Sequence, residues 1–528
     1  MFKVLIPDDL SQAGLDVLRA DPGITVDVVK KMPRADLLAR IGEYHALIVR
    51  SETKVDAEVI EAGRKLRVVG RAGIGVDTID VDAATRRGVI VMNTPQANTT
   101  ATCEHTLAMM LALARNIPQA DASVRRIEWT RSKFMGVQLA GKTLGVIGFG
   151  RIGTQVARRA QAFGMEILAF DPFVSEEHAR ASKVQLVTLE ELLAQSDFVT
   201  LHSSLTQGSR GLLDEEHIAL MKQGARIVNV ARGALIDLDA LEKALVSGHL
   251  GGAAIDVFEE EPPGDLPLFK LPNVIVTPHL GASTVEAQRD VSIQMAEQIV
   301  DALNDKDVRN AVNFPPIDPN ALPVVKPYLQ LSENLGTIMA HLIDGRLQRV
   351  EVEYRGGDVA PHVKPLTVAL LRGLLAPVLG RDAVNYVNAP LIASERGILV
   401  TQALNLTASE YTNLVSLRAT TDQGEHLIAG TCFDGAEPRI VQIDNFRIDA
   451  VPSGTAVLIS SRDVPGVVGR VGTILGANYV NIAEYRLGRT KAGDRAMSFV
   501  NLDNQVPEYA MKALRDLPEV LWVKQITL

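Results

Sequence analysis

Short apolar runs alternate with amphipathic segments at the start of the chain. The runs are rich in β-branched residues and lie at 3–7, 46–49, 66–70 and 89–92. Between the first two runs, apolar residues recur at helical spacing, at Leu10, Ala13, Leu15 and Leu18. This alternation of strand-like and helix-like segments predicts a small domain with a parallel sheet covered by helices.

A second alternating block follows a helix-like stretch that we expect from about Thr100 to Arg126. Its expected strands are 143–147, 166–170, 197–201, 226–230, 252–255 and 274–277. Strands separated by helices in this way are typical of a doubly wound sheet. A further helix is predicted over 283–304, begun by Ser283 or Thr284 with Glu286 nearby, and we expect it to return the chain to the first domain.

The rest of the chain predicts two more domains. Prolines in the segment 313–319 exclude a helix interior or a central strand and predict a linker. Strand-like runs at 350–354, 398–401 and 426–431 then alternate with helices, and residues 453–528 follow the ferredoxin-like order β-α-β-β-α-β. We therefore expect two doubly wound α/β domains, an α+β domain and a ferredoxin-like domain, with limits 1–97 plus 283–312, 98–282, 313–452 and 453–528.

Composition narrows the classes of function. A chain of 528 residues is too long for one core, and its net charge of -9 argues against nucleic acid as a partner. Cys103 and Cys432 are too few for a disulfide framework or a zinc cluster, so we expect no metal and a reducing, cytoplasmic setting. Neither a secretory signal nor an uncharged apolar stretch of about 18 residues is apparent, so we expect no membrane association.

A glycine loop, Gly148-Phe149-Gly150-Arg151-Ile152-Gly153, lies between an expected strand and an expected helix. In this context such a loop binds a dinucleotide, because the pyrophosphate can approach the N–H groups at the helix N-terminus. Asp171 ends the next expected strand, where an acid accepts hydrogen bonds from the ribose hydroxyls, and no arginine follows it directly. The loop therefore predicts NAD rather than NADP.

Oxidation of a hydroxy acid needs a cation for the carboxylate, a base for the hydroxyl proton and an acid that orients the base. Arg232 follows an expected strand at the carboxyl edge of the sheet, where a guanidinium suits a carboxylate. His279 also follows a strand and suits proton exchange near neutral pH. The acid is one of the consecutive residues Glu259, Glu260 and Glu261, and composition does not choose among them. His202 also ends a strand, and we interpret it as a neighbour of the cofactor.

The chain resembles the D-isomer-specific 2-hydroxyacid dehydrogenases along its whole length. The motifs that carry the resemblance are Val49-Arg50-Ser51, Gly70-Arg71-Ala72-Gly73, Gly75-Val76-Asp77, Asn93-Thr94-Pro95, the glycine loop, 229–233, 256–258 and His279-Leu280-Gly281. The family pattern Asp-Val-Phe-x-x-Glu-Pro selects Glu261, because Pro262 follows it. The resemblance thus implies Arg232, Glu261 and His279 as the catalytic residues.

The same resemblance implies the rest of the site. The residues expected to line NAD are Ile74, Gly148, Gly150, Arg151, Ile152, Gly153, Asp171, Ser203, Ala231, Asp256 and Gly281. Those expected to face the substrate are Arg50, Ser51, Lys54, Arg71, Gly73, Asn98 and, from a neighbouring subunit, Arg131. Cations in this set suit a phosphate. The implied reaction is the NAD-dependent oxidation of 3-phospho-D-glycerate (3-phosphoglycerate) to 3-phosphooxypyruvate, the first committed step toward serine.

The last domain resembles an ACT domain, a module that senses small molecules, and residues 320–452 resemble an intervening domain of long-form relatives. Asp463-Val464-Pro465-Gly466 and 478–481 match the ACT ligand loop and the start of its second strand. The resemblance implies L-serine as an effector, Asp463 and Asn481 as its contacts, and a homo-oligomer, expected to be a tetramer. Three alternatives stay open: a dehydrogenase of the same fold acting on glyoxylate, hydroxypyruvate or lactate, an ACT domain without strong feedback, and a sensor that has lost catalysis.

Overall fold

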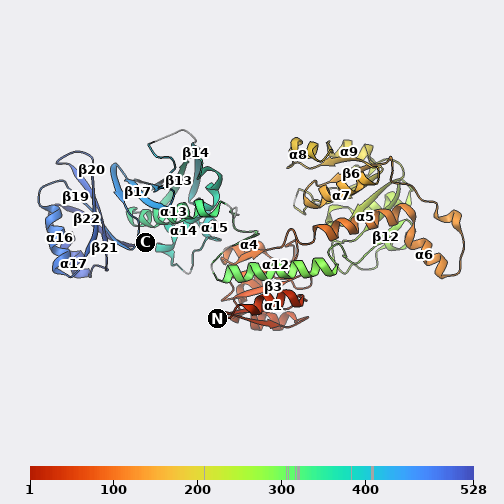
Figure 1. Ribbon diagram of the computed structural model, residues 1–528, viewed down its shortest axis with the longest axis horizontal. Helices are drawn as coiled ribbons and strands as arrows, with labels where there is room; N and C mark the ends of the chain where they lie inside the picture. The colour runs from red at the N-terminus through yellow and green to blue at the C-terminus, as the bar shows by residue number, and fades with distance from the viewer. Residues whose placement is uncertain are drawn as a thin grey trace.

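The computed structural model describes residues 1–206, 208–304, 306, 308–315, 317, 321–381, 383–405 and 410–528. Within these residues the strands form four sheets, each with its own helices. In Figure 1 the sheet with the N-terminus lies at the lower centre, the second sheet lies at the right, and the two C-terminal sheets lie at the left. The four-part architecture confirms the expected fold class, whereas the limits set above for each domain stay a prediction.

The first sheet is parallel throughout, in the order β2-β1-β3-β4-β5. Its strands are β1 (Phe2–Ile6), β2 (Ile24–Val28), β3 (Ala46–Val49), β4 (Val68–Arg71) and β5 (Ile90–Met92). Helices α1 (Gln12–Ala20) and α12 (Val285–Leu303) bury one face, and α2 (Arg34–Arg40), α3 (Ala57–Ala62) and α4 (Val81–Arg86) bury the other. Strand β2 escaped prediction because it is a half-exposed edge strand that carries Thr25 and Asp27.

Helix α12 returns the chain to the first sheet, as predicted. It begins where the Thr284 side chain accepts a hydrogen bond from the Ala287 N–H at 3.1 Å. The helix lies so close to β4 that a Cβ on Gly70 would come within 2.3 Å of the Met295 sulfur. The first domain is therefore built from two separate stretches of chain.

The second sheet is parallel, in the order β12-β11-β10-β9-β6-β7-β8. Successive strands are added on one side of β6 and then on the other, as in a Rossmann fold. Its strands are β6 (Thr143–Ile147), β7 (Glu166–Phe170), β8 (Gln185–Leu186), β9 (Phe198–Leu201), β10 (Ala225–Asn229), β11 (Leu250–Ile255) and β12 (Val274–Val276). All six expected strands are confirmed. The unpredicted seventh, β8, is too short to carry an apolar pattern.

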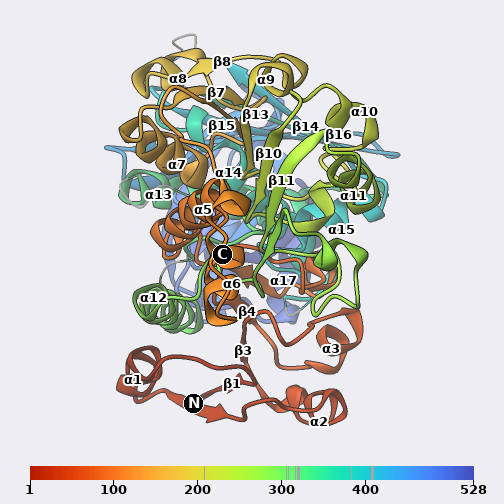
Figure 2. The same ribbon diagram turned by 90° about the vertical axis from the view of Figure 1, so that its right-hand side faces the viewer.

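Helices cover both faces of this sheet (Figure 2). Helices α5 (Thr99–Arg115) and α7 (Arg151–Ala162) share one core, and α9 (Leu189–Gln195), α10 (Glu215–Ala219) and α11 (Leu238–Val246) share the other. The short α8 (Glu176–Ala181) lies beside the edge strand β8. The doubly wound arrangement brings the carboxyl ends of the strands to one edge.

The single helix expected over 100–126 is wrong. Helix α5 ends at Arg115, Asn116 adopts a left-handed conformation with φ 53°, and α6 (Ile117–Arg125) starts a new helix. Pro118 has no N–H to continue the ladder, so the Ala114 carbonyl instead accepts from the Val137 N–H at 2.9 Å. Helix α6 and the short helix η2 (Arg131–Phe134) form an arm that projects at the right of Figure 1.

The third sheet is mixed, in the order β14-β13-β15-β16-β17-β18. Its strands are β13 (Leu347–Arg355), β14 (Leu399–Asn405), β15 (Leu414–Thr421), β16 (Glu425–Phe433), β17 (Glu437–Ile443) and β18 (Phe446–Ala450). Helices α13 (Leu322–Leu342) and α14 (Val363–Leu379) pack on one face, and α15 (Ala389–Glu395) packs on α14. The predicted strands β13, β14 and β16 are confirmed, and β15, β17 and β18 were missed.

One stretch of this domain, Ala360–Leu379, is long and apolar enough to cross a membrane by length and composition alone. Most of it is buried against the rest of the domain, with Leu366, Leu370 and Leu374 in the shared core. Core helices of folded domains pass the same test, so burial accounts for the apolar character of this helix.

The C-terminal domain has the predicted ferredoxin-like order, with the sheet β20-β21-β19-β22. Its elements are β19 (Thr455–Arg462), α16 (Val467–Ala477), β20 (Ile482–Arg489), β21 (Arg495–Leu502), α17 (Glu508–Arg515) and β22 (Val520–Thr527). One sheet face packs on α16 and α17. Leu458, Phe499 and Ile526 on the other face belong to the core that surrounds α13. The two C-terminal domains therefore share one hydrophobic core.

These C-terminal domains attach to the first domain through asparagine side chains. Asn313 accepts a hydrogen bond from the Val91 N–H at 2.9 Å and donates to the Val89 carbonyl at 2.9 Å. Asn385 donates to the Gly88 carbonyl at 2.8 Å. The predicted linker begins at this contact, although its residues Pro316, Asp318 and Pro319 lie outside the described part of the chain.

Candidate active site

The glycine loop has the geometry of a dinucleotide-binding turn. Gly148 has φ +90°, and a Cβ on Gly153 would come within 2.1 Å of the Gly148 carbonyl oxygen, so both positions require glycine. Gly150 precedes the first turn of α7, and a Cβ there would meet no atom within 4 Å. The open space at Gly150 lies where a pyrophosphate would approach the helix N-terminus.

Asp171 lies beside this loop at the end of β7. Its carboxylate accepts hydrogen bonds from the Phe149 N–H at 2.8 Å and the Phe173 N–H at 2.9 Å. The acid is thus fixed next to the glycine turn, in the position that the sequence predicted for recognition of a ribose.

His202 and Ser203 follow β9 on the other side of the turn. Their backbone lies so close to Gly148 that a Cβ there would come within 2.7 Å of it. Burial lowers the pKa of His202 to about 3, so its ring stays neutral at physiological pH. The ring Nε2 lies 3.0 Å from the Thr200 hydroxyl. A permanently neutral imidazole suits a neighbour of the cofactor better than an acid/base.

His279 and Glu261 form a hydrogen-bonded pair, with 2.6 Å between Nδ1 and Oε2. The other Glu261 oxygen accepts from the Phe258 N–H at 3.0 Å. Burial alone would raise the pKa of Glu261, but the hydrogen bonds from His279 and Phe258 outweigh it, and the net shift is downward. An ionised Glu261 therefore fixes Nδ1 of the imidazole and leaves Nε2 as the proton-exchanging atom.

A buried carboxylate holds the turn that carries His279. Asp256 is fully buried and accepts from the Leu280 N–H at 2.7 Å, the Gly281 N–H at 2.9 Å and the Thr277 hydroxyl at 2.5 Å. Burial would raise the pKa of Asp256, but these hydrogen bonds and one from His105 lower it overall. His279 itself has φ 54°, an uncommon backbone state that such a network can maintain.

His105 was missed by the sequence analysis. It lies on α5, far from Asp256 in the chain, and its Nε2 is 3.2 Å from both the Asp256 carboxylate and the Thr277 hydroxyl. The sequence showed only that His105 is a polar residue on a mostly apolar helix. It did not indicate that Asp256 is its hydrogen-bond partner.

Arg232 follows β10 and reaches the first domain. Its Nε donates to the Asp77 carboxylate at 2.9 Å, and its Nη1 donates to the Ala231 carbonyl at 2.6 Å. Asn229 donates to the Arg232 carbonyl and accepts from the Ala231 N–H, which fixes the loop. The guanidinium therefore sits where the two doubly wound domains meet.

Two more arginines from the first domain carry positive charge toward the same place. Burial, followed by the positive charge of Arg232, lowers the pKa of Arg71 to about 10, and burial also lowers the pKa of Arg50. The Nε atoms of Arg50 and Arg71 are buried and have no hydrogen-bond partner among the described residues. Buried unpartnered donors are costly, so this cluster is built to receive an anionic ligand.

The remaining predicted substrate residues are placed in three ways. Asn98 is buried beside the start of α5, and its Oδ1 has no hydrogen-bond partner among the described residues. Ser51 and Lys54 lie in an exposed segment after β3. Arg131 is exposed on the projecting arm.

Two more residues that the sequence predicts to line NAD, Ile74 and Arg151, lie near the junction of the two domains. The Ile74 carbonyl accepts from Asn93 at 2.6 Å, and the exposed Arg151 donates to the Pro95 carbonyl at 3.4 Å. Gly73 was predicted to face the substrate; a Cβ there would collide with Arg71, so this glycine makes room for the guanidinium. Three more residues were predicted to line NAD. Ile152 lies on α7, Ala231 follows β10, and Gly281 follows β12.

The two predicted effector contacts have separate partners. Asp463 accepts from the Gly493 N–H at 3.0 Å and from Arg489 at 3.4 Å. Asn481 donates to the Asp503 carboxylate at 2.6 Å. Each side chain is thus held within its own loop of the C-terminal domain.

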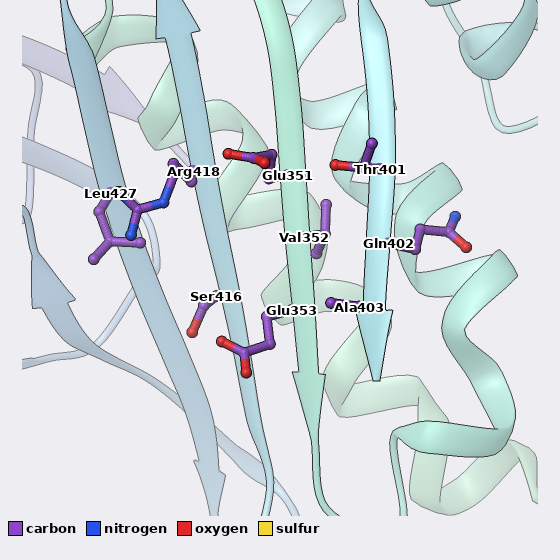
Figure 3. A pocket seen from close by; sticks show the side chains of 9 residues that line it. All are labelled: Glu351, Val352, Glu353, Thr401, Gln402, Ala403, Ser416, Arg418 and Leu427. Atoms are coloured by element: carbon purple, nitrogen blue, oxygen red, sulfur yellow. The ribbon is translucent and has the colours of Figure 1, made fainter. Parts of the chain in front are cut away.

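A hollow on the open face of the third sheet lies outside this site (Figure 3). Glu351, Glu353 and Arg418 point onto this face from β13 and β15. Glu353 pairs with Arg355 at 2.8 Å, and Arg418 pairs with Glu425. These charges are already paired, so among the described residues the hollow offers no unpartnered cation like those of the arginine cluster.

Three family models match consecutive parts of the chain. The D-isomer specific 2-hydroxyacid dehydrogenase, NAD binding domain, matches residues 107–281. The D-3-phosphoglycerate dehydrogenase intervening domain matches residues 324–444, and the ACT domain matches residues 455–519. The cofactor is therefore NAD, as predicted.

Curated relatives are similar over nearly their full length. D-3-phosphoglycerate dehydrogenase of Synechocystis sp. is 44% identical over 96% of this chain and 91% of the relative. The enzyme of the same name from Methanocaldococcus jannaschii is 44% identical over 100% of both chains.

Solved structures match the first two domains. The TT0316 protein from Thermus thermophilus has 38% identity and a TM-score of 0.55, covering 59% of this chain and 99% of its own. D-Lactate dehydrogenase from Aquifex aeolicus, complexed with NAD and lactic acid, has 26% identity and a TM-score of 0.54, covering 60% of this chain and 100% of its own.

The open space at Gly150 predicts a selective loss of cofactor binding in Gly150→Ala. The added methyl group meets no protein atom, so stability should not change, but it would occupy the path of the pyrophosphate. We expect NAD affinity to fall by about tenfold or more, measured by calorimetric titration. Gly357→Ala, where a Cβ also meets no atom within 4 Å, is the matched control and should bind NAD normally. Wild-type affinity in Gly150→Ala would contradict this placement of the cofactor.

Proposed function

The chain belongs to the D-3-phosphoglycerate dehydrogenases, within the D-isomer-specific 2-hydroxyacid dehydrogenases, and from this premise we propose that it oxidises 3-phospho-D-glycerate to 3-phosphooxypyruvate. It is an NAD-dependent oxidoreductase. The proposed reaction is the first step of phosphorylated L-serine biosynthesis.

The observation that carries this proposal is the cluster of Arg50, Arg71 and Arg232. Two of these arginines have buried Nε atoms that find no hydrogen-bond partner in the described part of the chain, and repulsion by the other arginines contributes to the lowered pKa of Arg71. A substrate with one carboxylate would leave much of this positive charge uncompensated. A substrate with a carboxylate and a phosphate supplies anionic partners for all three guanidinium groups.

Each of the three proposed catalytic residues has a separate role in the oxidation. When bound, NAD supplies the acceptor for the hydride that leaves C2 of the substrate. Arg232 holds the carboxylate, and His279 Nε2 accepts the proton of the C2 hydroxyl as the carbonyl forms. The ionised Glu261 at 2.6 Å stabilises the resulting imidazolium and keeps its ring in place. In the reverse reaction the same imidazolium returns the proton.

We expect a strong preference for the phosphorylated substrate. NADH formation from 3-phospho-D-glycerate should exceed that from D-glycerate by at least about a hundredfold in kcat/KM, because the unphosphorylated acid leaves buried arginines unpaired. Because NAD is a weak oxidant, both compounds should also be assayed as their 2-oxo acids with NADH. Equal turnover of the two compounds would support a glyoxylate or hydroxypyruvate reductase instead, and no turnover at all would support a sensor that has lost catalysis.

His279→Ala tests the proposed base. We expect kcat to fall by at least about a hundredfold, with NAD affinity nearly unchanged. The pKa of Glu261 is lowered, so this acid stays ionised on mild acidification and remains available to pair with the imidazole. His217→Ala is a matched control, since it removes another histidine–carboxylate pair, with Asp214 at 2.8 Å. A normal rate in His279→Ala would refute the assignment.

L-Serine is the proposed effector of the ACT domain, with Asp463 and Asn481 as contacts. The ACT match supports a small-molecule ligand, and the shared core gives the ACT domain a direct mechanical connection to the intervening domain. The Asn385–Gly88 hydrogen bond then connects that domain to the first sheet. Feedback by the end product would suit the first step of a pathway.

Truncation after Pro316 should separate catalysis from regulation. The TT0316 protein is covered over 99% of its own length by 59% of this chain, so a chain of about the shortened length should fold. We expect it to retain measurable NADH formation and to lose any response to serine. Inhibition by serine that persists in the truncated protein would contradict the placement of the sensor.

We further propose a cytoplasmic homotetramer. Exposed apolar side chains on the arm, Ile127, Trp129 and Met135, favour contact with another copy of the chain, and Arg131 lies among them. From this arm Arg131 would reach the site of a neighbouring subunit. Cys103 and Cys432 are both free and buried, as expected in a reducing compartment.

A further inference from the structure

Asp77 has a role that the three catalytic residues do not explain. It lies in the loop after β4, in the first domain, whereas its partner Arg232 belongs to the second domain. The Asp77 carboxylate accepts from Arg232 Nε at 2.9 Å. This ion pair therefore crosses from one doubly wound domain to the other at the site itself.

The surroundings leave the guanidinium little freedom. Nη1 is engaged by the Ala231 carbonyl, and Nε is engaged by Asp77. Nη2 lies against Gly75, where a Cβ would come within 1.8 Å of it and within 2.5 Å of the Asp77 carboxylate. Gly75 thus makes room for the Arg232–Asp77 pair, and Asp77 sets the orientation of the planar guanidinium.

Charge gives a second reason for an acid at this position. Arg232 lowers the pKa of Arg71 and Asp77 opposes that shift, so Asp77 partly offsets the repulsion within the arginine cluster. Without a bound anion, this repulsion favours a guanidinium that turns toward solvent. Asp77 counters that tendency while Arg232 waits for substrate.

We propose that Asp77 is a positioning residue that holds Arg232 in the orientation that receives the substrate carboxylate. This proposal takes one assumption from the function proposed above, namely that Arg232 binds the substrate carboxylate. It does not depend on a phosphate at the other end of the substrate. Asp77 acts through Arg232 and takes no proton in the reaction.

If Asp77 only stabilised the fold, its loss would lower the thermal midpoint, whereas a positioning role predicts a change in the kinetics alone. The side chains of Arg232 and Asp77 are 27% and 49% exposed, and ion pairs this exposed contribute little to stability. Loss of Asp77 should therefore leave the thermal midpoint nearly unchanged. Misorientation of a substrate-binding group, in contrast, reduces rates strongly even when the displacement is about 1 Å.

The test compares Asp77→Ala, Asp77→Asn and a control in the full-length enzyme. The readouts are kcat and KM for whichever of 3-phosphooxypyruvate, hydroxypyruvate or glyoxylate the wild type reduces best, KM for NADH, and the thermal midpoint. Glu43→Ala is the control, because it removes an exposed ion pair of the same domain, with Lys3 at 3.1 Å.

In Asp77→Ala we expect kcat/KM for the 2-oxo acid to fall by about tenfold to a hundredfold, mainly through KM, while KM for NADH stays within about twofold. Asp77→Asn should recover part of this loss, because its amide oxygen still accepts from Arg232 Nε although the charge that offsets the repulsion is gone. Glu43→Ala should match the wild type.

Wild-type kinetics in Asp77→Ala would overturn the proposal, as would an Asp77→Asn variant as impaired as Asp77→Ala. A fall in thermal midpoint that accounts for the lost activity would also overturn it. A wild type that reduces hydroxypyruvate or glyoxylate but not 3-phosphooxypyruvate would refute the proposed substrate and leave this test intact.

Discussion

Parallel strands place their carboxyl ends at one edge of a sheet, and the whole site depends on this constraint. Arg71 ends β4 in one sheet, whereas Arg232 and His279 follow β10 and β12 in the other. The two edges face each other because α12 returns to the first sheet and the Asp77–Arg232 pair joins the loops. Residues that lie far apart in the chain are therefore brought to the junction of the two domains, without any one of them needing a long or flexible loop.

The position of His279 depends on the buried carboxylate of Asp256. Asp256 uses its carboxylate to hold the turn at 277–281, and that turn sets the left-handed backbone of His279. Because the uncommon backbone state is supported by several hydrogen bonds from one buried acid, the imidazole keeps a fixed direction toward Glu261. Glu261, His279 and the turn thus form one hydrogen-bonded unit, which is the arrangement that the proposed proton transfer requires.

Sequence patterns predicted the elements with a regular apolar spacing and the motifs with a fixed set of residue types. Buried strands of the two parallel sheets, the glycine loop and the Thr284 cap each leave a local signal, and the family pattern distinguished Glu261 from its neighbours. Patterns failed where the outcome depends on partners distant in the chain. The break at Asn116 depends on a carbonyl that pairs with Val137, and neither the role of His105 nor the shared core of the C-terminal domains has a local signature.

The C-terminal domains can influence the cleft through the last strand of the first sheet. Asn313 and Asn385 bind the backbone at 88–91, the segment that leads into and forms β5, which runs beside β4 and leads to Asn93. Asn93 donates to the Ile74 carbonyl, in the loop that also carries Gly75 and Asp77. A shift of the C-terminal body that moves this backbone would therefore reach the loop that orients Arg232. Since tightly packed strands deform little, even a small movement there would change the orientation of Arg232 and, with it, the proposed binding of the carboxylate.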